Sequence, residues 1–270
     1  MSDGAEQRWP FWYGPAALVI GLLAGVIGGV FAVLLVEGGA AAAKGNLSPA
    51  ATDIATVIQD LGFVGAALFL AAHIAPPRPA QFGLRSPRSW PRAIGVAAAA
   101  AAGFVVISSA YFASLNQSGQ EKEFVKQIGG NAGTVSVLAV CVLVTVIAPV
   151  CEEILFRGFI FRSLSNWRGP WPAAIATGIL FGLVHGLSAP AVDLAPLALL
   201  GFLLCVVYYK TGSLYLTILA HSVNNALALS SDEGWGAGRA VALLAAALAL
   251  LALAAWLLRL ASARWTPATG

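Results

Sequence analysis

Apolar residues in this chain gather into eight long runs separated by short polar stretches. Most runs approach the roughly 20 residues that a helix needs to cross a bilayer, while the fifth, sixth and seventh are shorter. They cover residues 15–36, 54–75, 93–115, 134–164, 171–187, 194–209, 213–229 and 237–260. The pattern therefore predicts an all-α, polytopic membrane protein with about eight transmembrane helices.

The composition agrees with a membrane location. Of the 270 residues, 59% are hydrophobic and only 10% are charged, whereas soluble domains carry about 25% charged residues. Cys141, Cys151 and Cys205 all fall inside apolar runs, so we expect buried side chains rather than a disulfide framework. No repeat or linker divides the sequence, and we interpret residues 1–270 as a single transmembrane domain. The sequence has no basic stretch interleaved with aromatic residues, so nucleic acid is not an expected partner.

Positive charge is distributed unevenly between the two sides that eight crossings create. One side receives eleven of the 15 Lys and Arg residues, and the other side receives only Lys44, Lys122, Lys126 and Arg239. Cytosolic loops carry the excess of positive residues, so both termini are predicted to be cytosolic. The composition, which is rich in Ala and Arg and lacks an organelle signal, favours a bacterial plasma (inner) membrane.

A polar motif interrupts the fourth apolar run. Glu152 and Glu153 follow a stretch without charge, and Arg157 comes one helical turn later. A charge at the bilayer centre costs about 2.5–3.5 kcal/mol on insertion scales, and ionisable residues there are usually functional. The i, i+4 spacing with the acid first favours a Glu153–Arg157 ion pair. Glu152 is then left without a local partner.

Two further apolar runs contain polar residues at compatible depths. His185 lies in the fifth run, and His221 and Asn225 share one helix face in the seventh. At 1.5 Å per residue, Glu152 and His185 lie roughly 18–22 Å from the turn between their helices, and His221 lies at a depth of roughly 12 Å. We therefore expect Glu152, His185, His221 and Asn225 to meet in one cavity that opens toward the cytosol.

Such a cluster has the chemistry for peptide-bond hydrolysis. A carboxylate can take a proton from water, and a histidine can hold that water or relay the proton. A histidine and an asparagine amide can donate hydrogen bonds to the developing oxyanion. Glu152, His185 and His221 would also suffice as ligands of a catalytic divalent metal such as zinc, although the sequence lacks His-Glu-x-x-His. We favour the mechanism without metal and keep zinc as the alternative.

These motifs resemble those of the CPBP intramembrane proteases, the CAAX-protease and bacteriocin-processing relatives that include the Rce-type prenyl-protein endopeptidases. The chain carries, in order, Glu152/Glu153/Arg157, Phe181/His185 and His221/Asn225. Phe82-Gly-Leu-Arg85 is similar to a weaker signature of bacterial members. The strong resemblance covers about residues 134–230, which would form the catalytic core.

The resemblance implies an intramembrane endopeptidase with a glutamate base at Glu152, His185 beside it, and an oxyanion site from His221 and Asn225. Its substrate would be a membrane-associated peptide or protein, cut near the cytosolic leaflet. Prenylated substrates are implied by the eukaryotic branch but are not favoured here. Glu153 and Arg157 would set the geometry of their helix.

Other interpretations use the same residues. The protein could be a non-enzymatic membrane immunity or scaffold protein of this fold. A solute transporter should show inverted repeats or broken helices, which the sequence does not indicate. Ser188 with His221 weakly resembles a rhomboid pair, and Cys151 is a poor nucleophile because acids adjoin it. Asp60 and His73 are interpreted as packing or interface residues.

Overall fold

The computed structural model describes residues 9–39, 48–115 and 133–264. Within these ranges the chain is helical and contains no β-strand. The α-helices are α1 (Tyr13–Glu37), α3 (Pro49–Ala72), α4 (Trp90–Ser114), α6 (Gly133–Val142), α7 (Ala148–Glu153), α8 (Arg162–Arg168), α9 (Pro170–Val184), α10 (Leu194–Thr211), α11 (Leu214–Asp232) and α12 (Ala237–Arg264). The predicted all-α polytopic membrane protein is confirmed. Lys44, Lys122 and Lys126 lie outside the described residues.

The helices correspond one to one with the eight apolar runs when α6, α7 and α8 are counted as one continuous helix. Six of these helices are long and apolar enough to cross a membrane. The other two are α9, which has 15 residues, and α11, whose interior contains His221 and Asn225. The two helices that are too short or too polar for this criterion are therefore the one that ends just before His185 and the one that contains His221.

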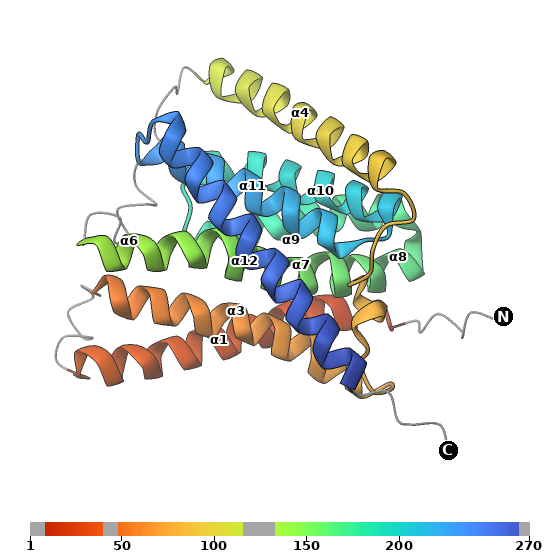
Figure 1. Cartoon of the computed structure of the whole chain (residues 1–270). Coiled ribbons are helices and arrows are strands. Elements are labelled where there is room, and N and C mark those ends of the chain that lie inside the picture. The colour runs from red at the N-terminus through yellow and green to blue at the C-terminus, as the bar shows by residue number, and fades with distance from the viewer. Residues whose placement is uncertain (1–8, 40–47, 116–132, 265–270) are drawn as a thin grey trace.

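The continuous α6–α8 helix lies at the centre of the bundle. Figure 1 shows α1 and α3 side by side along one flank, and α1 and α3 both contact the α6–α8 helix. On the other side, α9, α10 and α11 pack together, with α4 at the outer edge against α10 and α11. The last helix, α12, crosses the bundle diagonally and contacts α11. Buried aromatic residues such as Phe156 and Phe159 form the core around the central helix.

The central helix contains two π-helical stretches, Leu143–Ile147 and Ile154–Phe161. Pro149 lies just after the first stretch and has no backbone N–H, so the usual α-helical hydrogen bond to the carbonyl of Thr145 cannot form. π-helical turns inside α-helices are frequent at functional sites. Glu152 and Glu153 therefore lie in a short α-helical segment, α7, between these two π-helical stretches.

The sequence Phe82-Gly-Leu-Arg85 connects the loop before α4 to the turn between α10 and α11. Tyr208 Oη donates a hydrogen bond to the Phe82 carbonyl at 3.1 Å, and the Leu214 N–H donates to the Gly83 carbonyl at 2.7 Å. Gly83 has a φ of 89°, which only glycine adopts without strain, and a Cβ there would clash with the Tyr208 ring. This signature therefore has a structural role at the bundle end.

Glycine residues allow α9 and α10 to approach closely. A Cβ at Gly182 would lie 2.6 Å from the Leu194 carbonyl oxygen. We expect Gly182→Ala to lower the free energy of unfolding by about 1–3 kcal/mol, because the backbone must shift. Gly103→Ala on α4, where nothing lies within 4 Å of the new Cβ, should be neutral or stabilising. Unfolding measured in the same detergent compares the two variants, and equal stabilities would contradict the close approach of α9 and α10.

Candidate active site

Glu152 on α7 faces the two histidines of the neighbouring helices. Its Oε1 lies 4.0 Å from His185 Nε2, and its Oε2 lies 3.9 Å from His221 Nε2. Side-chain exposure is 13% for Glu152, 22% for His185 and 3% for His221. The structure thus brings together three of the four predicted catalytic residues, from α7, from the turn that follows α9 (His185–Leu187), and from α11.

Both imidazole rings are held through their Nδ1 atoms. His185 Nδ1 lies 2.7 Å from the Phe181 carbonyl oxygen, and His221 Nδ1 lies 2.9 Å from Glu153 Oε1. Carbonyl and carboxylate oxygens only accept hydrogen bonds, so in each neutral ring the proton is assigned to Nδ1. Each Nε2 then carries a lone pair, and these two atoms lie 4.0 and 3.9 Å from the Glu152 carboxyl oxygens.

Glu153 and Arg157 form the predicted ion pair, and it is completely buried. Arg157 Nη1 donates to Glu153 Oε1 at 2.6 Å, and Nη2 donates to the Gly201 carbonyl of α10 at 3.0 Å. The guanidinium carbon also lies 4.6 Å from the centre of the Phe181 ring. Because the same Glu153 oxygen accepts from His221, the ion pair helps to orient the imidazole ring that faces Glu152.

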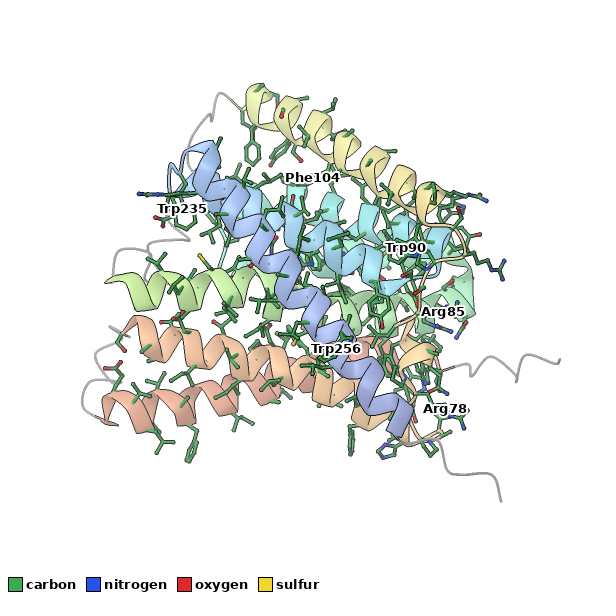
Figure 2. All side chains as sticks on the ribbon, viewed as in Figure 1. Arg78, Arg85, Trp90, Phe104, Trp235 and Trp256 are labelled. Atoms are coloured by element: carbon green, nitrogen blue, oxygen red, sulfur yellow. The ribbon has the colours of Figure 1, made fainter. Side chains whose placement is uncertain are left out.

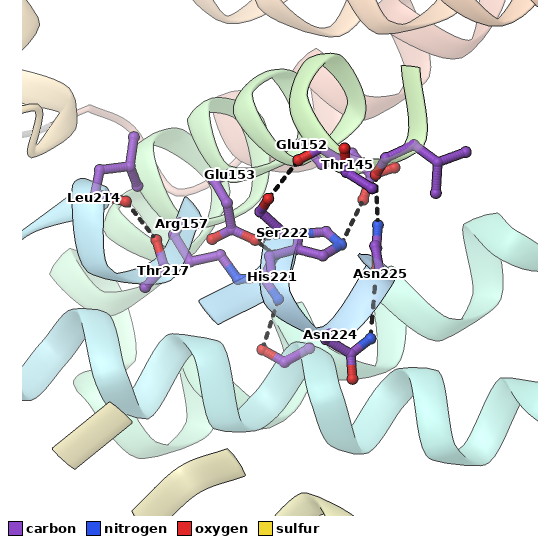
Figure 3. Close-up of polar contacts among 12 residues, drawn as sticks. Thr145, Glu152, Glu153, Arg157, Leu214, Thr217, His221, Ser222, Asn224 and Asn225 are labelled. Carbon is purple, nitrogen blue, oxygen red and sulfur yellow. Dashed lines mark hydrogen bonds and ion pairs between the residues drawn. The ribbon is translucent and has the colours of Figure 1, made fainter. Parts of the chain in front are cut away.

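Asn225, the fourth predicted catalytic residue, contacts the backbone of the central helix (Figure 3). Its Nδ2 donates to the Val144 carbonyl at 3.0 Å, and its Oδ1 accepts from Asn224 at 3.3 Å. One turn earlier on the same face, Ser222 Oγ donates to the Thr145 carbonyl. Since an amide nitrogen carries two hydrogens, Asn225 retains a second donor beyond the one that it gives to Val144.

Ser222, which the sequence analysis did not single out, and Asp60, which it interpreted as a packing or interface residue, both lie near the site. Asp60 on α3 is 3% exposed and interacts electrostatically with Glu152. Its Oδ2 has no hydrogen-bond partner among the described residues. A charge inside an apolar run, the signal that selected Glu152, also applies to Asp60 and could have identified it.

Three other residues considered from the sequence lie in less reactive surroundings. His73 ends α3 in an exposed position, and its Nδ1 lies 2.8 Å from the Phe69 carbonyl oxygen. Ser188 is exposed, and its hydroxyl donates to the His185 carbonyl at 3.4 Å. Cys151 is a buried free thiol.

The donors around Glu152 suit a divalent metal in their chemistry. Histidine ligands usually donate their second ring nitrogen to a carbonyl or carboxylate group, as His185 and His221 do. Within the described ranges, however, no group of three or more His, Cys, Asp or Glu side chains is close enough to be assigned as a metal site. If a metal binds, Glu152, His185 and His221 would hold it, and it would supply an activated water.

Comparison with known proteins identifies relatives of the central part of the chain. Residues 134–227 match the family described as type II CAAX prenyl endopeptidase Rce1-like. An "Uncharacterized 24.3 kDa protein" from Escherichia coli is 30% identical over 109 residues, which are 39% of this chain and 50% of that protein. "UPF0177 protein YxdF" from Lactococcus lactis is 31% identical over 93 residues, 34% of this chain and 50% of that protein. The chain thus spans about half the length of these two relatives.

A third relative carries a functional description. "Putative membrane peptidase YdiL" from Bacillus subtilis is 31% identical over 84 residues, which are 30% of this chain and 32% of that protein. No solved structure matches the chain. The Rce1-like match covers Glu152, His185, His221 and Asn225. Residues 134–227 are therefore similar to the Rce1-like family, and the predicted resemblance to the CPBP family is confirmed.

Proposed function

We propose that the protein is an intramembrane endopeptidase that cuts a membrane-associated peptide or protein near the cytosolic leaflet. The observation that carries this proposal is the meeting of Glu152, His185 and His221, in which both carboxylate oxygens face an imidazole Nε2 at 4.0 and 3.9 Å. The Rce1-like match over residues 134–227 supports the protease class.

Glu152 acts as the general base in the proposed reaction. Separations of 3.9 and 4.0 Å exceed direct hydrogen-bond length, but one water molecule about 2.8 Å from each group can bridge them. This water donates one hydrogen to Glu152 and the other to the Nε2 lone pair of His185. Glu152 takes the proton as the water oxygen attacks the carbonyl carbon, and then gives it to the leaving amine.

His221 and Asn225 stabilise the oxyanion of the tetrahedral intermediate. His221 can donate from Nε2 when its ring is protonated, and the Glu153 carboxylate at Nδ1 stabilises such an imidazolium, as an orienting acid does in a catalytic triad. Asn225 contributes the amide hydrogen that Val144 does not use. Each preorganised donor of this kind is worth about 10²–10³ in rate.

We infer a multi-pass protein of the plasma (inner) membrane with both termini in the cytosol. Figure 2 shows Arg78 and Arg85 at the end of the bundle where α4 begins, with Trp235 at the opposite end. The Arg-bearing loop between α3 and α4 therefore lies at one end of the bundle, as the positive-inside rule expects of a cytosolic loop. The lipid bilayer and a membrane-associated substrate are its proposed partners.

The experiment that tests this function is peptide cleavage by the purified protein in liposomes. A mixed pool of lipidated and transmembrane peptides is incubated with wild type or Glu152→Gln, each with and without a chelator, and new termini are identified by mass spectrometry. Cleavage that requires Glu152 and survives the chelator supports the metal-free mechanism. Cleavage lost to the chelator and restored by zinc makes Glu152, His185 and His221 metal ligands. No cleavage in any arm would favour the immunity or scaffold function.

A further inference from the structure

The π-helical stretch Leu143–Ile147 contains a backbone carbonyl that cannot accept the usual α-helical hydrogen bond from its own helix. Pro149 lacks the N–H that would reach the Thr145 carbonyl four residues earlier. Thr145 is 1% exposed, so it is surrounded by protein rather than by bulk water. Its own hydroxyl donates backward to the Cys141 carbonyl at 2.6 Å. The Thr145 carbonyl therefore lacks its usual α-helical partner and is free to accept a hydrogen bond from another helix.

Ser222 of α11 supplies that donor (Figure 3). Its side chain is fully buried, and its hydroxyl donates to the Thr145 carbonyl oxygen. Asn225, one turn further along α11, donates to the neighbouring Val144 carbonyl at 3.0 Å. Two side chains of one helix thus bind two consecutive carbonyls of the π-helical turn. Such a turn is a local irregularity that neighbouring side chains can hold in place.

Helix α11 contacts the central helix a second time, at the site itself. His221 precedes Ser222 directly and lies 2.9 Å from Glu153 and 3.9 Å from Glu152. Thr145 and Glu153 are about two helical turns apart. Adjacent residues of α11 therefore hold the central helix on both sides of Pro149, so the rotation and height of α7 relative to α11 depend on both contacts.

We propose that Ser222 is a positioning residue. By donating to the Thr145 carbonyl it holds the π-helical stretch in place, and this orients Glu152 toward His185 and His221. The role assigned to it rests on the proposed endopeptidase function. If the hydroxyl is removed, the π-helical stretch loses its hydrogen bond from Ser222, and α7 can shift relative to α11. A displacement of about 1 Å between reacting groups lowers the rate by up to about 10²-fold.

The test compares Ser222→Ala with Ser230→Ala in the liposome cleavage assay. Ser230 lies on the same helix, is 4% exposed, and donates to the Ala226 carbonyl of its own helix at 2.7 Å, so its removal controls for loss of a buried hydroxyl. We expect Ser222→Ala to lower kcat about 10- to 100-fold with KM within twofold, and Ser230→Ala to stay within threefold of wild type in both constants. Ser222→Thr, which keeps the hydroxyl, should recover most of the kcat.

A second measurement separates this proposal from the endopeptidase function. Amide hydrogen exchange over residues 143–150 should quicken in Ser222→Ala and stay unchanged in Ser230→Ala, whether or not a substrate is known. If the wild-type protein cleaves no peptide, the endopeptidase function fails. The rate of amide hydrogen exchange alone then decides whether Ser222 stabilises the π-helical stretch. Ser222→Ala with kcat and exchange equal to those of Ser230→Ala would overturn the proposal.

Discussion

Glu152→Gln is expected to lower the rate of peptide cleavage by about 10²–10⁴-fold, the usual contribution of a general base. Glutamine has nearly the same shape as glutamate but cannot accept the proton of the attacking water. The change should leave the fold intact, because Glu152 Oε2 has no hydrogen-bond partner among the described residues. Single-turnover cleavage in liposomes measures the loss, and thermal unfolding in detergent checks that the protein remains folded.

Glu37→Gln is the matched control for this substitution. Glu37 ends α1 and accepts a hydrogen bond from the Ser48 N–H at 3.1 Å, so the variant removes a carboxylate that no proposed step uses. It should keep wild-type activity within about twofold. A Glu152→Gln protein that is folded and cleaves within threefold of wild type would rule out the general-base role. In cells, a scaffold should keep its phenotype in Glu152→Gln, whereas an endopeptidase should lose it.

The number and type of helices could be predicted because a bilayer demands long apolar segments. Helix ends were less predictable from hydropathy alone. The second apolar run begins at residue 54 by that criterion, but α3 begins at Pro49. Ser48 accepts a hydrogen bond from the Ala51 N–H at 3.3 Å, and proline is favoured in the first turn of a helix. These capping residues were visible in the sequence, although the apolar pattern does not include them.

The local part of the candidate site follows from helical periodicity, because residues at i and i+4 share a face. The Glu153–Arg157 pair and the bond from His185 to the Phe181 carbonyl both have this spacing. Contacts between helices depend on how each helix rotates about its axis, which no short pattern encodes. The approach of Asn225 to Val144 is therefore a finding of the structure alone.

The hydrogen bond of Ser222 is a second contact between helices that the sequence does not predict. A serine in a membrane helix commonly donates to a carbonyl one turn earlier on its own helix, as Ser230 does. Nothing in the local sequence shows that Ser222 instead donates to Thr145 of another helix. Pro149 was a visible signal of a carbonyl that lacks its α-helical partner, but the contact of that carbonyl with Ser222 becomes known only when α11 is placed beside the central helix.

Arg157→Met is expected to lower the free energy of unfolding by about 3–5 kcal/mol, the usual effect of removing one partner of a buried ion pair. Glu153 and Arg157 have no exposed side-chain surface, so the variant leaves the Glu153 carboxylate without its countercharge. It also removes the donor to the Gly201 carbonyl. Methionine keeps much of the apolar length of arginine, so the change chiefly removes charge and hydrogen bonds. Denaturant titration in mixed micelles measures the loss.

The double variant Glu153→Gln/Arg157→Met distinguishes uncompensated charge from lost packing. If the destabilisation arises from the isolated carboxylate, neutralising residue 153 should restore a large part of the stability, because buried ion pairs replaced by neutral groups are often close to neutral in effect. The amide oxygen of glutamine can still accept from His221 Nδ1. Arg168→Met, at an exposed arginine beside Trp167, should change stability by less than about 1 kcal/mol. A double variant as unstable as Arg157→Met alone would show that packing of the arginine side chain, rather than its charge, stabilises this part of the central helix.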